Sequence, residues 1–74
     1  MADLTKHLGS VLRARRQEVG LSQDALAAIC EVSRGYLGQV ERGEVSITIT
    51  LLERLARGLN TTISDVIHEV DGDA

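Results

Sequence analysis

One short segment, residues 33–43, carries the side chains best suited to specific hydrogen bonding. If Leu37 and Val40 face inward on a helix, the opposite face presents Arg34, Gly35, Gly38, Gln39 and Arg42. A guanidinium can donate two hydrogen bonds to guanine, and a glutamine amide can both donate to and accept from adenine. Glycines on this face would permit close approach to another surface. The pattern is consistent with a helix that reads base edges, but a solvated surface helix with these residues would look the same.

Residues 21–43 predict two short helices joined by a tight turn, which would position this face. Ser22 and Ser33 are expected N-caps, because their hydroxyls can accept from the free amides of a first helical turn. Glu31 falls in the turn, and Gly43 is expected to end the second helix in the left-handed conformation. The inward stripe of the first helix is expected to be Ala25, Leu26, Ala28 and Ile29. This arrangement is typical of a helix-turn-helix, whose second helix enters the major groove.

These residues resemble the Cro and phage-repressor-like helix-turn-helix family, often called XRE-type regulators. The resemblance covers Leu8 to Ile67 and rests on the joint spacing of Gly20-Leu21-Ser22-Gln23, Leu26-Ala27, Val32-Ser33-Arg34 and Glu41-Arg42-Gly43. Chain size and the Tyr36-Leu37-Gly38 region also resemble the restriction-modification controller proteins. The resemblance implies an all-α fold: a compact five-helix, lambda-repressor-like DNA-binding domain with a central helix-turn-helix.

The same resemblance implies roles for individual residues. Arg34 and Gln39 match positions that touch bases. Positions that hold phosphates, which set register without reading sequence, are matched by Gln23, Ser33 and Arg42. Tyr36 falls between these two kinds of position, or simply packs its ring against the domain. With the two glycines of the outer face, the expected DNA-binding set is Gln23, Ser33, Arg34, Gly35, Tyr36, Gly38, Gln39 and Arg42.

Three departures from the family pattern have physical consequences. Glu31 stands where relatives usually have glycine, and a left-handed residue other than glycine costs on the order of 1 kcal/mol. Ile47-Thr48 replaces the Pro-Ser that often precedes the fourth helix. The same loop carries Glu44 and few cations, so a weaker hold on phosphate is expected than in many relatives.

Two of the three remaining helices are expected on either side of this pair. Residues 5–19 predict a first helix that Gly20 stops, with an inward side of Leu8, Leu12 and Val19. A fourth helix is expected over residues 48–59, with Asn60 as a left-handed cap and an inward side of Ile49, Leu52, Leu55 and Leu59. The resemblance also implies an ion pair between Arg16 and Glu41 that ties the first helix to the second helix of the motif. Two independent surface charges are the alternative.

A fifth helix is expected to open at residues 62–65, which resemble a capping box with Asp in place of Glu. Its apolar residues are too many for one four-helix body to cover, and dimers of the family often form through this end. The expected homodimer interface is Ile63, Val66, Ile67 and Val70; the alternative is that this helix closes the monomer's own core. The domain is expected to span residues 5–70, followed by a short acidic tail over residues 71–74.

Composition limits the other possibilities. The 74 residues form one small domain with no Phe or Trp, so its core must be aliphatic. The single cysteine, Cys30, excludes an internal disulfide and is expected to be a buried hydrophobe. No apolar run is long enough to cross a bilayer and the start does not resemble a signal peptide, so a cytoplasmic location without membrane contact is expected.

Net charge argues against nucleic-acid binding, because it is −3 where a basic domain would be expected. The distribution weakens that objection. Up to residue 43 there are six Lys or Arg against five acids, whereas from residue 44 onward there are two against six. Since charges are screened within about 8–10 Å at ordinary salt, the local balance matters more than the total.

No residue pattern indicates catalysis, a metal or a cofactor. His7 and His68 lie far apart in the sequence, and no Cys or carboxylate arrangement with metal-ligand spacing accompanies them. Two functions remain open. The first is a sequence-specific regulator that binds double-stranded DNA as a homodimer on a (pseudo)palindromic operator. The second is an antitoxin-like or adaptor module on the same fold, whose main contact is a protein partner.

Overall fold

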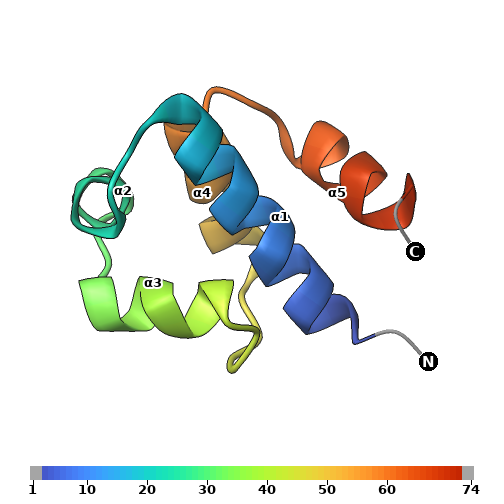
Figure 1. The fold of residues 1–74 in the computed structure, drawn as a ribbon, viewed down its shortest axis with the longest axis horizontal. Helices are drawn as coiled ribbons and strands as arrows, with labels where there is room; N and C mark the ends of the chain where they lie inside the picture. Colours follow the sequence, from blue (N-terminus) through green and yellow to red (C-terminus); the bar gives the residue numbers. More distant parts are fainter. Residues whose placement is uncertain (1–2, 73–74) are drawn as a thin grey trace.

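The computed structural model describes residues 3–72, and these residues form five α-helices, which confirms the all-α five-helix class (Figure 1). In order they are α1 (Leu4–Val19), α2 (Gln23–Cys30), α3 (Arg34–Glu41), α4 (Ile49–Gly58) and α5 (Ile63–Gly72). The helix-turn-helix is formed by α2 and α3. Because α5 continues to Gly72, the first half of the predicted acidic tail is helical, while Asp73 and Ala74 lie outside the described residues.

Short polar side chains set where the helices begin. Ser22 accepts from the amide of Ala25, and Ser33 accepts from the amide of Tyr36, as predicted. The same kind of cap opens the other helices at Asp3, Thr48 and Thr62. Each cap satisfies an amide that has no partner within its helix, which fixes the first turn. At α5 the Thr62 hydroxyl accepts from the Asp65 amide, which is one half of the expected capping box. The other half differs, because the Asp65 carboxylate accepts from the Thr61 hydroxyl.

Left-handed residues set where the helices end. Gly20 (φ 86°), Gly43 (φ 72°) and Asn60 (φ 57°) adopt this conformation at the ends of α1, α3 and α4. Glu31 (φ 60°) does so between α2 and α3. The left-handed conformation was predicted from the sequence at Glu31, Gly43 and Asn60, whereas Gly20 was predicted only as the end of the first helix. Among the four residues, Glu31 is the one that is neither Gly nor Asn, so its turn is the strained one.

The helices pack around α1, which contacts α3 on one side and α5 on the other (Figure 1). α2 packs on α3 and α4, and α4 in turn packs on α5. This order leaves the helix-turn-helix at one end of a body 32 × 23 × 21 Å across, with α5 at the other. No helix within residues 3–72 is both long and apolar enough to span a membrane.

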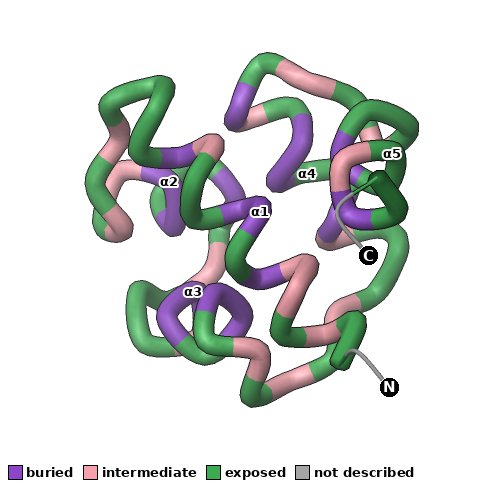
Figure 2. Tube along the Cα trace, turned by 45° about the vertical axis from the view of Figure 1, so that its right-hand side comes forward, coloured by how far each residue is buried: buried purple, intermediate pink, exposed green. Residues whose placement is uncertain are grey.

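The core is aliphatic and lies where the five helices face one another (Figure 2). Its most deeply buried side chains are Leu12, Leu26, Leu37, Leu55, Val66 and Cys30. The predicted inward faces were partly wrong. α2 buries Leu26, Ala27 and Cys30 because it lies between α3 and α4, which leaves Ala28 and Ile29 exposed. Val19 and Ile49 are also exposed, since they occupy helix ends where the chain turns away from the core.

Candidate nucleic-acid interface

The outer face of α3 and the beginning of α2 form one open surface. A shallow hollow of about 210 Å³ brings together five of the predicted residues: Gln23, Arg34, Gly35, Gly38 and Arg42. Ser33 and Gln39 are exposed on the same short helix or its cap. This surface, called the α2–α3 face below, comprises these seven residues.

α3 is held in place by its opposite side. Leu37 and Val40 are buried in the core, as predicted, which turns Arg34 and Gln39 outward. Tyr36 is half-buried and packs against the core. Of the two roles that the sequence allowed, DNA contact or packing, its ring therefore has the packing role.

A buried charge network fixes α3 to α1 and α2. The Nε of Arg16 donates to Oε2 of Glu41 at 2.7 Å, and its Nη2 donates to Oε1 at 3.1 Å. The amide of Gln23 also donates to Oε1 of Glu41, at 3.0 Å, while Nη1 of Arg16 donates to the carbonyl of Leu21. The predicted ion pair is therefore present, and the alternative of two independent surface charges is wrong. The Glu41 carboxylate of α3 thus joins three helices, because it accepts from Arg16 of α1 and from Gln23 of α2.

A second close contact between α1 and α3 was missed by the sequence reasoning. A Cβ added at Gly9 would lie 2.5 Å from the carbonyl oxygen of Val40 and 2.6 Å from that of Glu41. Only a glycine therefore lets α1 reach the last turn of α3. The available signal was a glycine inside a predicted helix, which is unfavourable there unless close packing requires it.

Both arginines of the α2–α3 face already have carboxylate partners. Arg42 donates from Nε and Nη2 to Glu44 at 2.9 and 3.1 Å. The Nε of Arg34 lies 3.5 Å from Oδ1 of Asp24. The hydrogen bond with Arg42 lowers the pKa of Glu44, and the same contact raises the pKa of Arg42. Glu44, which the sequence predicted would weaken the hold of this loop on phosphate, thus pairs with an arginine of the face itself, while the weaker hold stays a prediction.

The two glycines of the face differ. Gly35 is exposed, and an added Cβ there meets nothing within 4 Å, so this position is open to a close approach. Gly38 is buried, which corrects the prediction that it lies on the exposed surface. An added Cβ at Gly38 would lie 3.0 Å from Nη1 of Arg42, because this guanidinium covers the glycine.

The predicted dimer residues on α5 divide into two groups. Val66 (0% exposed) and Val70 (6%) belong to the monomer core, so their assignment to an interface is wrong. They face inward because α5 packs against both α1 and α4. Ile67 (40% exposed) and the half-buried Ile63 remain accessible from outside.

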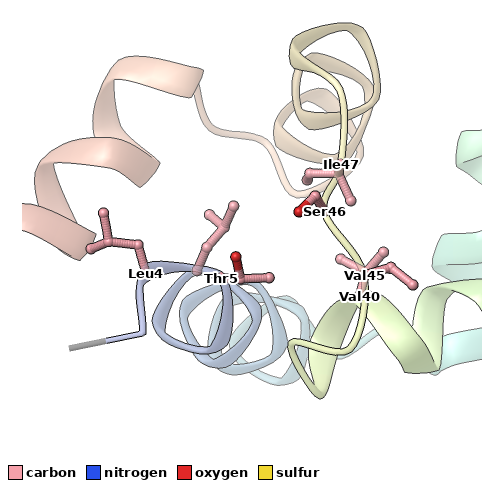
Figure 3. A pocket seen from close by; sticks show the side chains of 7 residues that line it. Leu4, Thr5, Val40, Val45, Ser46 and Ile47 are labelled. Carbon is pink, nitrogen blue, oxygen red and sulfur yellow. The ribbon is translucent and has the colours of Figure 1, made fainter. Parts of the chain in front are cut away.

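A separate hollow of about 260 Å³ opens between the start of α1 and the segment that follows α3 (Figure 3). It is largely apolar and is lined by Leu4, Thr5, Leu8, Val40, Val45, Ser46 and Ile47. None of the predicted DNA-binding residues lines it. Among residues 3–72, no group of three or more His, Cys, Asp or Glu side chains is arranged to hold a metal ion.

Cys30 is buried at the end of α2, as expected, and its Sγ lies 3.6 Å from the carbonyl oxygen of Arg54. Burial raises the pKa of this thiol, and the nearby charge of Arg54 acts in the opposite direction. A buried thiol with a raised pKa is a poor nucleophile, so Cys30 serves packing between α2 and α4.

Comparison with curated proteins finds several regulators of similar sequence. The chain is 40% identical to the HTH-type transcriptional regulator SutR of Escherichia coli over 67 residues, which span 90% of this chain and 38% of SutR. It is 28% identical to the control protein C.MunI of a Mycoplasma species, over 96% of this chain and 97% of that protein. The control protein C.SmaI of Serratia marcescens is 37% identical over 88% of this chain and 77% of its own length.

Solved structures of regulators and controller proteins have the same fold as this chain. The restriction-modification controller protein C.AhdI from Aeromonas hydrophila superposes with a TM-score of 0.81 at 36% identity, over 89% of this chain and 98% of C.AhdI. The clp gene regulator ClgR from C. glutamicum superposes with a TM-score of 0.89 at 35% identity, over 93% of this chain and 88% of ClgR. The family model HTH_3, described as helix-turn-helix, matches residues 12–66, and the chain belongs to this family of XRE/Cro-like, DNA-binding regulators.

Proposed function

We propose that the chain is a sequence-specific transcriptional regulator that binds double-stranded DNA as a homodimer, with α3 in the major groove of a (pseudo)palindromic operator. The observation that carries the proposal is the open α2–α3 face. It gathers Arg34, Gln39 and Arg42 with the beginning of α2, while the opposite side of α3 is fixed in the core. A cytoplasmic location and the absence of enzymatic activity follow from this role.

The charge distribution supports this orientation. The acidic excess lies from residue 44 onward and includes three carboxylates on α5, whereas α4 carries one Glu and two Arg; α5 is at the opposite end of the body from α3 (Figure 1). A duplex at the α2–α3 face would therefore be separated from the carboxylates of α5. Near the face, Glu44 and Asp24 each contact one of its arginines, and the buried Glu41 accepts from Gln23.

In this proposal Arg34 and Gln39 read bases, while Gln23, Ser33 and Arg42 hold phosphates. Selection of preferred duplexes from a random pool is the most direct test, and the expected product is an inverted repeat. Arg34→Ala should relax the preference at one base position per half-site by about 1–3 kcal/mol. Arg42→Ala should weaken all duplexes alike and flatten the salt dependence. Loss of affinity by Arg34→Ala that is equal for every sequence would remove Arg34 from the base-reading role.

Dimerisation is proposed through the exposed part of α5, which contains Ile63 and Ile67. Such a contact is isologous, since the same patch of each subunit faces its copy. Ile67→Glu should shift the sedimentation coefficient of a dimer to that of a monomer, while the helical circular dichroism stays unchanged because this side chain is not part of the core. A variant that remains dimeric would place the interface elsewhere.

A second candidate function is the antitoxin-like or adaptor module. The apolar hollow at Leu4, Val45 and Ile47 favours it, because it offers a protein partner a surface that DNA contact does not use (Figure 3). A pull-down from cell extract, paired with a salt-titrated DNA shift assay, separates the two functions. Only the regulator requires a duplex for its main contact.

A further inference from the structure

The guanidinium groups that a duplex would meet on the α2–α3 face are not free in this structure. Arg42 and Glu44 form a two-point hydrogen-bonded pair, and Arg34 lies beside Asp24. All four side chains are more than half exposed. Each of the two arginines thus has an acidic partner on the same surface, through two hydrogen bonds at Arg42 and through one ion-pair contact at Arg34.

The geometry of Arg42 shows what this pairing occupies. Its Nε and Nη2 form the fork that donates two parallel hydrogen bonds to a carboxylate or a phosphate. Both donors are directed to Glu44, and Nη1 lies against Gly38. A phosphate can therefore obtain this fork only by displacing Glu44. The buried Gly38 is the position that allows the arginine to lie flat on α3 while it is held.

We propose that Glu44, and Asp24 in the same way at Arg34, compete with DNA for the arginines and thereby lower the affinity of the α2–α3 face for its specific duplex. This inference rests on the proposed function, because it concerns the same face. An exposed ion pair is weak enough to be exchanged. In a specific complex, base contacts hold α3 deep in the groove, and the arginines exchange their carboxylates for DNA acceptors. In a non-specific complex those base contacts are missing and the pairs stay closed.

The salt dependence of binding distinguishes open from closed pairs. Each phosphate contact adds about 0.9 to the slope of log affinity against log salt. A non-specific complex in which Arg42 stays on Glu44 lacks that contact. Glu44→Gln frees the arginine, so the non-specific slope should increase by about 0.9 per bound subunit. Between 50 and 200 mM salt this corresponds to an additional loss of affinity of about 3.5-fold per subunit.

The experiment measures fluorescence anisotropy of two labelled duplexes, one chosen by selection from a random pool and one of scrambled sequence, from 50 to 200 mM salt. Glu44→Gln should tighten binding to the selected duplex severalfold, because that complex no longer has to open the ion pair, and should tighten binding to the scrambled duplex by no more than that. Asp71→Asn is the matched control, because it removes one exposed negative charge from α5, which packs on α1 and α4. It should change both duplexes slightly and equally.

Repeating Glu44→Gln in an Arg42→Ala background separates pairing from simple repulsion of phosphate. If Glu44 acts by holding Arg42, its substitution should have little effect once the arginine is gone. An undiminished effect in that background, or no tightening of the selected duplex, would overturn the inference while DNA binding itself stands. Failure of the wild type and of every variant to bind any duplex at 50 mM salt would overturn the proposed function, and this inference with it.

Discussion

The junction of α1 with α3 and the α2–α3 face contain the same chemical pair in opposite environments. Arg16 and Glu41 have side chains only 10% and 2% exposed, whereas Arg42 and Glu44 are 58% and 51% exposed. Both pairs make two hydrogen bonds of similar length. Removing one member of a buried pair leaves a charge without solvation, while water readily replaces either partner of an exposed pair. Burial therefore makes the first pair structural and leaves the second available for exchange.

The largest expected effect comes from breaking the buried pair. Arg16→Met should lower the free energy of unfolding by about 3–5 kcal/mol, because Glu41 would keep its charge in the core with only Gln23 as a side-chain donor. Urea denaturation followed by circular dichroism measures this change. Replacing both partners, as Arg16→Met with Glu41→Leu, should recover much of the loss. A single variant as stable as the wild type would contradict the structural role of the pair.

The next effect tests the close approach of α1 to α3 that lets this pair form. Gly9→Ala should cost about 1–3 kcal/mol, since the new Cβ would overlap the carbonyls of Val40 and Glu41. Gly35→Ala is the matched control within a helix, because its Cβ meets nothing within 4 Å. This control should be neutral or slightly stabilising in the same urea titration. Equal costs for the two variants would mean that helix packing does not explain Gly9.

A smaller effect, of the opposite sign, is expected at the turn between α2 and α3. Glu31→Gly should raise stability by about 1 kcal/mol, because glycine adopts the left-handed conformation without strain. For a domain of this size that corresponds to a melting temperature about 4–8 °C higher. Asn60→Gly should gain less, since asparagine tolerates the same conformation. A lower melting temperature for Glu31→Gly would imply that this carboxylate contributes more than its backbone costs.

The smallest effect is expected from the exposed pair. Glu44→Gln should leave the melting temperature at pH 7 unchanged within error, because an exposed ion pair contributes little to stability. Differential scanning calorimetry at low salt is the most sensitive check. A destabilisation comparable to that of Arg16→Met would break the distinction between the two regions.

Much of the helix-turn-helix was predictable from the sequence because it depends on local chemistry. Caps at Ser22 and Ser33 act over three residues, and the left-handed positions at Glu31 and Asn60 follow from the neighbouring helices. The predicted interface residues came from helical periodicity and the family pattern, and most of them do share one surface. Gly38 lines the same hollow but is buried, because the Arg42 guanidinium covers it, and the sequence does not show where that side chain lies.

The wrong predictions concern which apolar residues are buried, because burial depends on how the helices pack. Val66 and Val70 have the same apolar character as Ile67, yet only the packing of α5 against α1 and α4 determines which of them are covered. Periodicity likewise identified an apolar side of α2 but misplaced its centre, because the helix contacts two neighbours at once. Helix packing sets the rotation of each helix, and a single amphipathic pattern does not contain that information.

The sequence by itself determined the number of helices, the caps of the helix-turn-helix, the strained turn and the side of α3 that faces the core. These features depend on hydrogen bonds and spacing within a few residues. Tertiary structure alone decided that Gly9 admits α1 to the last turn of α3, and that Arg34 and Arg42 rest on Asp24 and Glu44. The reason is that such contacts depend on the distance and rotation between packed helices, or on which conformation a long side chain adopts on the folded surface.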